Sequence, residues 1–353
     1  MLERKYSFGS SGPEGTPCLI LITRIDSPLE LNMKKLVATF FLTILIAGAV
    51  FAQSPPTLRI VTETPGLPSE LFYGDIKVKP LRLRPGTNTP ITILDFDFFV
   101  QQQYIDFLRR FPEAEGLQFY MTTLNPSTLC LPSDNDCFKH LRGIVSANFF
   151  RSPEFQRKGS YVMYLYMVSL GQRPVSPAEL TDSTKIDRPR YAEFMADLQT
   201  ISVPDDNAQL TETKKAALAE AWLQRPEIQA KYPSSLSNAD FVQTLLNTGH
   251  VTVSNQSQLV NDLNTGAKTR GQVLRAIVES PEVNDKYYTQ AFVTMEYFGY
   301  LRRDPEDCHS APDPNQCGYI FHLNRFKLVS NPAEMENIIV RGFMESPEYL
   351  NRF

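Results

Sequence analysis

The sequence is poor in histidine and has no excess of basic residues. It holds 4 histidines among 353 residues, and 35 lysines and arginines against 39 aspartates and glutamates give a formal net charge of −4. Proteins that bind nucleic acid draw much of their affinity from basic side chains, which release counterions from the phosphate backbone. The charge balance therefore predicts no nucleic-acid partner.

Motifs of the common enzyme classes are also missing. The histidines are His140, His250, His309 and His322. They do not form a His-Glu-x-x-His segment, and we interpret His140 and His322 as surface or boundary residues of predicted helices. The chain has no nucleophile elbow, P-loop or dinucleotide fingerprint. We therefore predict no catalytic residue, cofactor or metal ligand, although a carboxylate pair could still meet in three dimensions.

Long apolar runs are rare, and the clearest one covers Leu36–Val50. Two lysines precede the run and small residues end it at Ala52, which is typical of a Sec-type signal peptide over residues 33–52. The run is short for a membrane span. We expect cleavage after Ala52, no stable membrane span in the mature chain, and a secreted or cell-surface protein, with the periplasm as the alternative location. We interpret residues 1–32 as a mis-called, unstructured start upstream of Met33.

Cysteine is scarce, and its spacing agrees with export. Beyond the leader the cysteines form two close pairs, Cys130 with Cys137 and Cys308 with Cys317. An even number of cysteines in an exported chain favours two small disulfide loops. A four-cysteine zinc site is the alternative, but neither pair has the short spacing typical of zinc ligands.

Proline is abundant, with 26 residues, and it is dense in residues 53–95. Proline disfavours helices and fits extended or edge-strand backbone, so we predict a Pro-rich extended arm in this segment. From Phe96 onward the apolar residues recur at helical spacing, as in Phe99, Tyr104 and Leu108. The fold class that we predict is all-α.

One short phrase recurs along the helical part. Its occurrences are Ser152-Pro153-Glu154, Arg225-Pro226-Glu227, Ser280-Pro281-Glu282 and Ser346-Pro347-Glu348. Serine is a good N-cap, proline fits the first helical position, and glutamate in the first turn favours the positive end of the helix dipole. We therefore predict that each phrase is a joint at which one helical unit ends and the next begins.

The segments between the joints can be aligned. The stretch from Phe99 to Pro112 matches the stretch from Phe292 to Pro305, and both carry a Leu-Arg-Arg-x-Pro ending. We predict degenerate helical repeats, in four units that form two pairs. Pro233-Ser234-Ser235 follows the second joint and breaks the chain, so we place helical-repeat domain 1 at 96–235 and domain 2 at 236–353.

Four features of the chain resemble a known protein family. They are the stretch FVQQQYIDFLRRFPEAEGLQFY at 99–120, the Cys130–Cys137 pair, the Ser-Pro-Glu joint and FGYLRRDPED at 298–307. Together they resemble the exported bacterial family catalogued as domain of unknown function 4214, over roughly residues 96–353. The resemblance implies an exported all-helical module and supplies no catalytic residues. Relatives often carry an acidic loop where this chain reads Asp313-Pro314-Asn315-Gln316-Cys317, so we expect a disulfide here in place of a Ca²⁺ site.

These observations leave three hypotheses about function. The first is a secreted, non-enzymatic helical module for binding or surface assembly, with an unknown extracellular protein or polysaccharide as its partner. The second is an extracellular protein that acts on polysaccharide, or assists such action, in a groove between the two repeat pairs. Tyr161, Tyr164 and Tyr166 are dense enough to line a groove, although core packing is their default role. The third is a self-assembling coat or linker protein, by analogy of fold alone.

Overall fold

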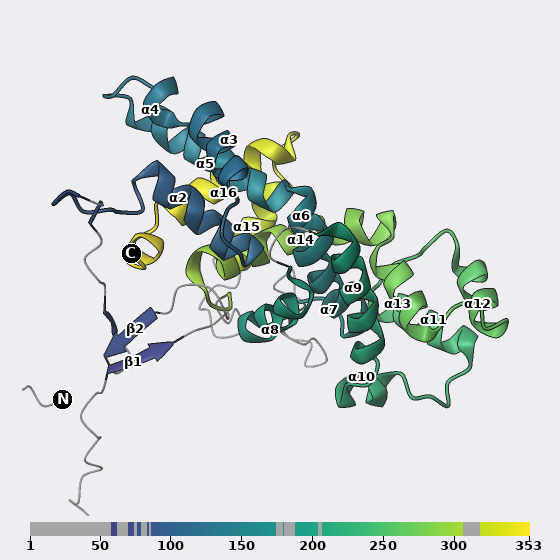
Figure 1. The fold of residues 1–353 in the computed structure, drawn as a ribbon. Helices are drawn as coiled ribbons and strands as arrows, with labels where there is room; N and C mark the ends of the chain where they lie inside the picture. Colours follow the sequence, from purple (N-terminus) through teal and green to yellow (C-terminus); the bar gives the residue numbers. More distant parts are fainter. Residues whose placement is uncertain are drawn as a thin grey trace, which may run out of the picture. The chain divides into compact units, whose positions relative to one another are not determined.

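The computed structural model describes residues 58–61, 70–73, 76–78, 83–84, 86–173, 179, 188–203, 207–305 and 318–353 (Figure 1). Within these residues the protein is built from helices, with one small sheet near the start, so the predicted all-α class is confirmed. The predicted signal peptide, Cys308, Cys317 and the loop at 313–317 lie outside the described residues.

The helices follow one another closely along the chain. Three of them, labelled η, are π-helical turns of five residues each. In chain order the helical elements are α2 (Phe96–Gln103), η1 (Tyr104–Leu108), α3 (Ala114–Thr123), α4 (Pro126–Leu129), α5 (Asn135–Arg151), α6 (Pro153–Phe155), η2 (Gln156–Ser160), α7 (Tyr161–Ser169), α8 (Tyr191–Ile201), α9 (Ala208–Trp222), α10 (Pro226–Lys231), α11 (Asn238–Thr248), α12 (Gln256–Asn264), α13 (Arg270–Val278), α14 (Pro281–Glu296), η4 (Tyr297–Leu301), α15 (Gly318–Phe326), α16 (Pro332–Met344) and α17 (Pro347–Leu350).

The sheet lies in the segment that the sequence predicts to be an extended arm. Strands β1 (Leu58–Val61), β2 (Glu70–Tyr73) and β3 (Ile76–Val78) pair antiparallel in the order β1-β2-β3. Leu58 lies opposite Tyr73, and Leu71 lies opposite Val78. Proline content predicts extended backbone here, but the pairing of the strands is a tertiary feature that the sequence does not predict.

Helix α7 is the centre of the hydrophobic core. All of its residues are buried, as expected for a helix that is apolar on every side. It packs against α8 on one side of the predicted domain boundary and against α11, α13 and α14 on the other. One continuous hydrophobic cluster therefore extends from Ile93 to Tyr349. The division of the chain into two domains near Pro233 stays a prediction.

The first and last helical segments also pack together. Helices α5 and α16 lie side by side (Figure 1). The π-helical turns η1 and η4 also contact each other. Glycines permit the close approach at both contacts. A Cβ atom on Gly143 would lie 3.0 Å from Cγ of Arg341, and one on Gly299 would lie 2.8 Å from the ring of Phe107.

The two segments that align in sequence also share an uncommon local geometry. Helix α2 runs into η1 and ends at Arg109 with φ of 57°, and α14 runs into η4 and ends at Arg302 with φ of 53°. Residues other than glycine seldom adopt this left-handed conformation. The matched Leu-Arg-Arg stretches therefore encode the same helix ending, while the full four-unit repeat stays a prediction.

Candidate functional site

The Ser-Pro-Glu joints lie at helix N-termini in the structure. The Oγ atoms of Ser152, Ser280 and Ser346 each accept a hydrogen bond from the backbone N–H three residues later, at 3.1, 3.3 and 3.1 Å. A proline occupies the first turn in each case. Arg225 also precedes a helix, α10, but its side chain makes no capping bond and instead stacks on Trp222 at 3.9 Å.

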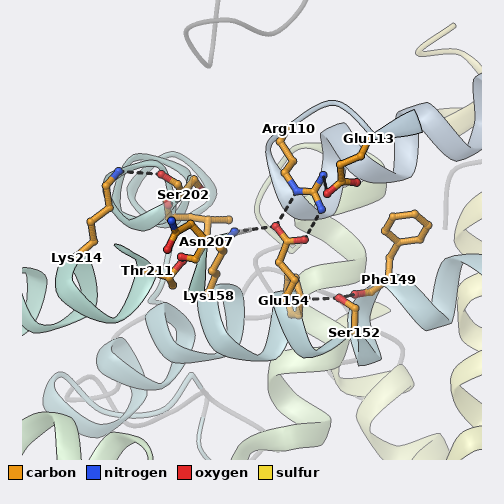
Figure 2. Close-up of polar contacts among 12 residues, drawn as sticks. Arg110, Glu113, Phe149, Ser152, Glu154, Lys158, Ser202, Asn207, Thr211 and Lys214 are labelled. Atoms are coloured by element: carbon orange, nitrogen blue, oxygen red, sulfur yellow. Dashed lines mark hydrogen bonds and ion pairs between the residues drawn. The ribbon is translucent and has the colours of Figure 1, made fainter. Parts of the chain in front are cut away.

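The glutamate of the first joint is locked between two buried cations (Figure 2). Arg110 donates to Glu154 through Nε at 2.9 Å and through Nη2 at 2.6 Å, and Lys158 donates to the same carboxylate at 2.7 Å. The side chains of Arg110 and Glu154 are only 9% and 7% exposed. Burial opposes the charge on Arg110, yet its hydrogen bonds to Glu154 and Glu113 raise its pKa overall. The cluster fixes the first joint to the end of η1.

The last joint repeats this contact in a more open setting. Arg303 donates to Glu348 through Nε at 2.5 Å and through Nη2 at 2.9 Å, with side chains 36% and 47% exposed. In the third joint, Glu282 accepts the backbone N–H of Ser254 at 3.0 Å. The joint glutamates thus bind partners within the fold and have a structural role.

A pocket of about 410 Å³ lies where η2 and α7 meet the junction of α13 and α14. We call it the α7–α14 pocket. Its lining comes from both sides of the predicted domain boundary, which is where the polysaccharide hypothesis places a groove. The lining residues are Gln156, Arg157, Ser160, Tyr161, Tyr164, Lys215, Val278, Glu279, Ser280, Pro281 and Asn284.

Two of the three clustered tyrosines line this pocket. The Tyr161 hydroxyl donates to the backbone oxygen of Lys215 at 3.0 Å, and the Tyr164 hydroxyl donates to Oδ1 of Asn284 at 3.1 Å. Both residues are buried, and burial raises the pKa of each phenol. Tyr166 instead donates to Asp197 at 2.6 Å inside the core. Core packing therefore accounts for most of each ring, while Tyr161 and Tyr164 also contribute to the pocket wall.

Two glutamates and two cations form a closed charge cluster at the pocket. Lys215 forms ion pairs with Glu279 and, at 3.3 Å, with Glu212. Arg275 pairs with Glu279 at 2.7 Å and also with Glu212. Burial favours the neutral form of Glu212, but Lys215 and Arg275 outweigh it and lower its pKa. Because each carboxylate is held by two cations, the cluster presents fixed polar groups at the pocket.

A buried carboxyl group lies elsewhere, at the end of α14. Glu296 is fully buried, and neither of its carboxyl oxygens has a hydrogen-bond partner. Burial, with a smaller effect of the nearby Glu336, raises its pKa well above the usual value. We did not single out Glu296 from the sequence. The alignment of the two segments could have drawn attention to it, because Glu296 occupies the position that Gln103 has in the first segment. Gln103 is a buried polar residue that donates to Tyr349 at 3.3 Å and accepts from Ser146.

The first predicted disulfide is confirmed. Cys130 and Cys137 are bonded, with their Cα atoms 5.8 Å apart, and the bond links the end of α4 to the first turn of α5. Asp134, between the two cysteines, caps α5 by accepting the Cys137 N–H at 2.9 Å. Cys308 and Cys317 lie outside the described residues, so the second disulfide stays a prediction.

Histidines and acidic residues do not gather as metal ligands in the part of the chain that the structure describes. No group of three or more histidine, cysteine, aspartate or glutamate side chains there could hold a metal ion. His140 and His250 are exposed, and His322 lies beside Phe343, with ring centroids 5.1 Å apart.

Comparison of the chain with protein-family models, with curated proteins and with solved structures finds no match. Among the described residues, every helix is too short or too polar to cross a membrane.

Proposed function

We propose that this chain is an exported, non-enzymatic helical module that binds an extracellular partner, with the α7–α14 pocket as its recognition site. The observation that carries the proposal is the charge cluster at this pocket. Its glutamates are held by Lys215 and Arg275, and Lys215 and Glu279 line the pocket, so the pocket wall carries charged groups that are fixed by ion pairs. The predicted signal peptide and the Cys130–Cys137 bond support an oxidising, extracellular setting.

We also propose that the chain belongs to the exported bacterial family of unknown function that residues 96–353 resemble. The Leu-Arg-Arg endings at Arg109 and Arg302, which share their backbone geometry, support a common module in the two segments. The proposal carries no enzymatic activity with it, because the resemblance supplies no catalytic residues.

Action on extracellular polysaccharide is the second candidate, favoured by the position of the α7–α14 pocket between the two predicted repeat pairs. The two candidates differ in whether a product appears. A binding module retains a polysaccharide unchanged, whereas an enzyme releases shorter chains.

The purified mature chain, incubated with a panel of neutral and acidic polysaccharides, separates these outcomes. We expect retention of at least one polymer without release of reducing ends. Asn284→Ala should weaken retention, because Asn284 lines the pocket, whereas Asn261→Ala on the exposed face of α12 should not. Release of reducing ends would favour the enzyme, and equal retention by both variants would remove the pocket from the proposal.

Export is tested by the intact mass of the protein recovered outside its own cells, with and without reduction. We expect a chain that begins at Gln53, with cysteines that can be alkylated only after reduction. A mass that begins at Met1 or Met33, or free thiols without reduction, would contradict export.

A further inference from the structure

A buried arginine without a carboxylate partner lies in α5. Arg142 is only 9% exposed, and its guanidinium carbon lies 4.5 Å from the centroid of the Phe99 ring. Its Nη2 donates to the backbone oxygen of Ile93 at 2.8 Å, while Nε is buried without an acceptor. Arginine stays protonated even where burial lowers its pKa, as it does here. A buried charge of this kind calls for a counter-ion.

The described acidic residues do not supply that counter-ion. Glu345 is the carboxylate with the largest electrostatic effect on Arg142, but its own ion pairs are with Lys139 at 3.4 Å and Arg341 at 3.5 Å. No carboxylate of the described residues forms an ion pair with Arg142 within 4.0 Å. The positive charge of Arg142 is therefore not neutralised by an ion pair within the described residues.

Arg142 lines a pocket of about 290 Å³ between the start of α2, α4 and α5, which we call the Arg142 pocket. Its lining contains both polar and apolar residues. The lining residues are Arg84, Leu94, Asp95, Phe96, Asp97, Met121, Asn125, Pro126, Ser127, Phe138 and Arg142.

The other polar groups of the pocket are suited to hydroxyl groups. Arg84 bridges Asp95, at 2.7 Å, and Asp97, at 2.9 Å, and its hydrogen bond to Asp97 lowers the pKa of that carboxyl. The two carboxylates stay ionised, and their remaining lone pairs can accept from ligand hydroxyls. Asn125 accepts the N–H of Ser127 at 3.0 Å through Oδ1, which leaves its amide NH₂ to donate.

The Arg142 pocket also has an apolar side. Leu94, which is 66% exposed, lies at the pocket with Phe96, Met121 and Phe138, and they can cover the C–H face of a small ring. A ligand that combines a carboxylate, several hydroxyls and an apolar face is a sugar acid. The volume admits one such unit.

We propose that the Arg142 pocket binds one uronate unit, with the sugar carboxylate against Arg142 and its hydroxyls against Asp95, Asp97 and Asn125. This inference rests on the proposed extracellular binding function and names a ligand class for it, at a second site. A free sugar acid and a unit of an acidic polysaccharide share this chemistry, so the test includes both.

The experiment is calorimetric titration of the mature chain with glucuronate, with glucose and with an acidic oligosaccharide. We expect glucuronate to bind at least about 10-fold more tightly than glucose, since a carboxylate–arginine pair is the main difference between the two complexes. Arg142→Gln should remove this preference, and Arg142→Lys should restore part of it. Arg325→Gln is the matched control, because Arg325 also stacks on a phenylalanine ring, at 5.5 Å, but lies outside the pocket.

Tighter binding of the oligosaccharide than of glucuronate would identify a polymer unit as the ligand, and equal binding would identify the free sugar acid. The inference fails if glucuronate and glucose bind equally, or if glucuronate does not bind at about 10 mM. If Arg142→Gln does not fold, glucuronamide, which lacks the charge, replaces the variant: binding as tight as that of glucuronate overturns the inference. If Asn284→Ala alone weakens polymer retention and Arg142→Gln does not, the proposed function stands and this inference falls.

Discussion

At the scale of single residues, one carboxylate joins the two ends of the helical chain. Asp106 in η1 is 1% exposed and accepts from Arg302 at 3.0 Å and from Arg352 at 2.9 Å. Burial favours its neutral form, but Arg352 and Arg302 outweigh burial and lower its pKa. Both arginines are distant from Asp106 in sequence, so their ion pairs with Asp106 hold η1 against the last segment of the chain.

We predict that Asp106→Asn destabilises the protein by about 3–5 kcal/mol, because it leaves two arginines in a buried site without their carboxylate. Chemical unfolding at pH 7 measures the change. The exposed Asp285→Asn on α14 is the control, with an expected change within about 0.5 kcal/mol. Equal stability of the two variants would contradict the role of Asp106.

The same residue predicts a dependence on pH. A carboxyl group with a lowered pKa in the folded state stabilises the fold above its unfolded pKa of about 3.9. That contribution is lost as the pH falls through the lower folded pKa. The difference in unfolding free energy between wild type and Asp106→Asn should therefore shrink between pH 5 and the most acidic pH at which the protein stays folded.

Glu296 predicts the opposite trend. Its pKa is raised in the folded state, so ionisation opposes folding as the pH rises above the ordinary glutamate pKa of about 4.3. Each unit of difference between the folded and unfolded pKa costs about 1.4 kcal/mol once the pH exceeds both. We expect Glu296→Gln to be more stable than wild type at pH 7 and to lose this advantage near pH 4, as measured by urea unfolding. An advantage that does not change with pH would contradict the prediction.

At the scale of elements, the Ser-Pro-Glu joint is the feature that the sequence predicts best. Serine caps, proline position and first-turn glutamate act within one helical turn, so the residues alone indicate that a helix begins there. The partner of each glutamate is decided by packing. Glu154 is buried with Arg110, whereas Glu348 meets Arg303 in a more exposed setting.

This contrast predicts different costs for the same substitution. Glu154→Gln should destabilise the protein by about 3 kcal/mol or more, because it removes a carboxylate shared by two buried cations. Glu348→Gln should cost less than about 1 kcal/mol, as expected for an exposed ion pair. Unfolding measurements on the two variants check this prediction. A similar loss of unfolding free energy in both would show that burial does not make the Glu154 ion pairs more important for stability than the Glu348 pair.

At the scale of the whole molecule, the hydrophobic core continues across the predicted domain boundary. Phe107 packs against Tyr300 with ring centroids 5.3 Å apart, and Phe150 packs against Phe292 at 4.9 Å. We expect a fragment covering 53–235 to lack a cooperative unfolding transition, because it loses the partners of these rings. Near-ultraviolet circular dichroism of the fragment and of the mature chain tests this. A cooperative transition in the fragment would support two independent domains.

The sequence by itself determined the helical class, the helix starts at the joints, the close pairing of Cys130 with Cys137 and the matched endings at Arg109 and Arg302. These features depend on contacts within a few residues of one another, and local pattern encodes them. The density of Tyr161, Tyr164 and Tyr166 in the sequence indicated a candidate groove lining, and two of the three, Tyr161 and Tyr164, line a pocket while Tyr166 lies in the core.

Only the tertiary structure decided which charges are buried and which of them have partners. It brought Asp106 to Arg352 and closed Glu212 and Glu279 between two cations. It also left Glu296 without a hydrogen-bond donor, and it placed Arg142 in the lining of a pocket, buried and without an ion-paired carboxylate among the described residues. Burial and long-range ion pairing depend on how helices pack, and no spacing along one chain specifies them. The candidate sites therefore emerged from the packing of helices whose class and starts the sequence predicted.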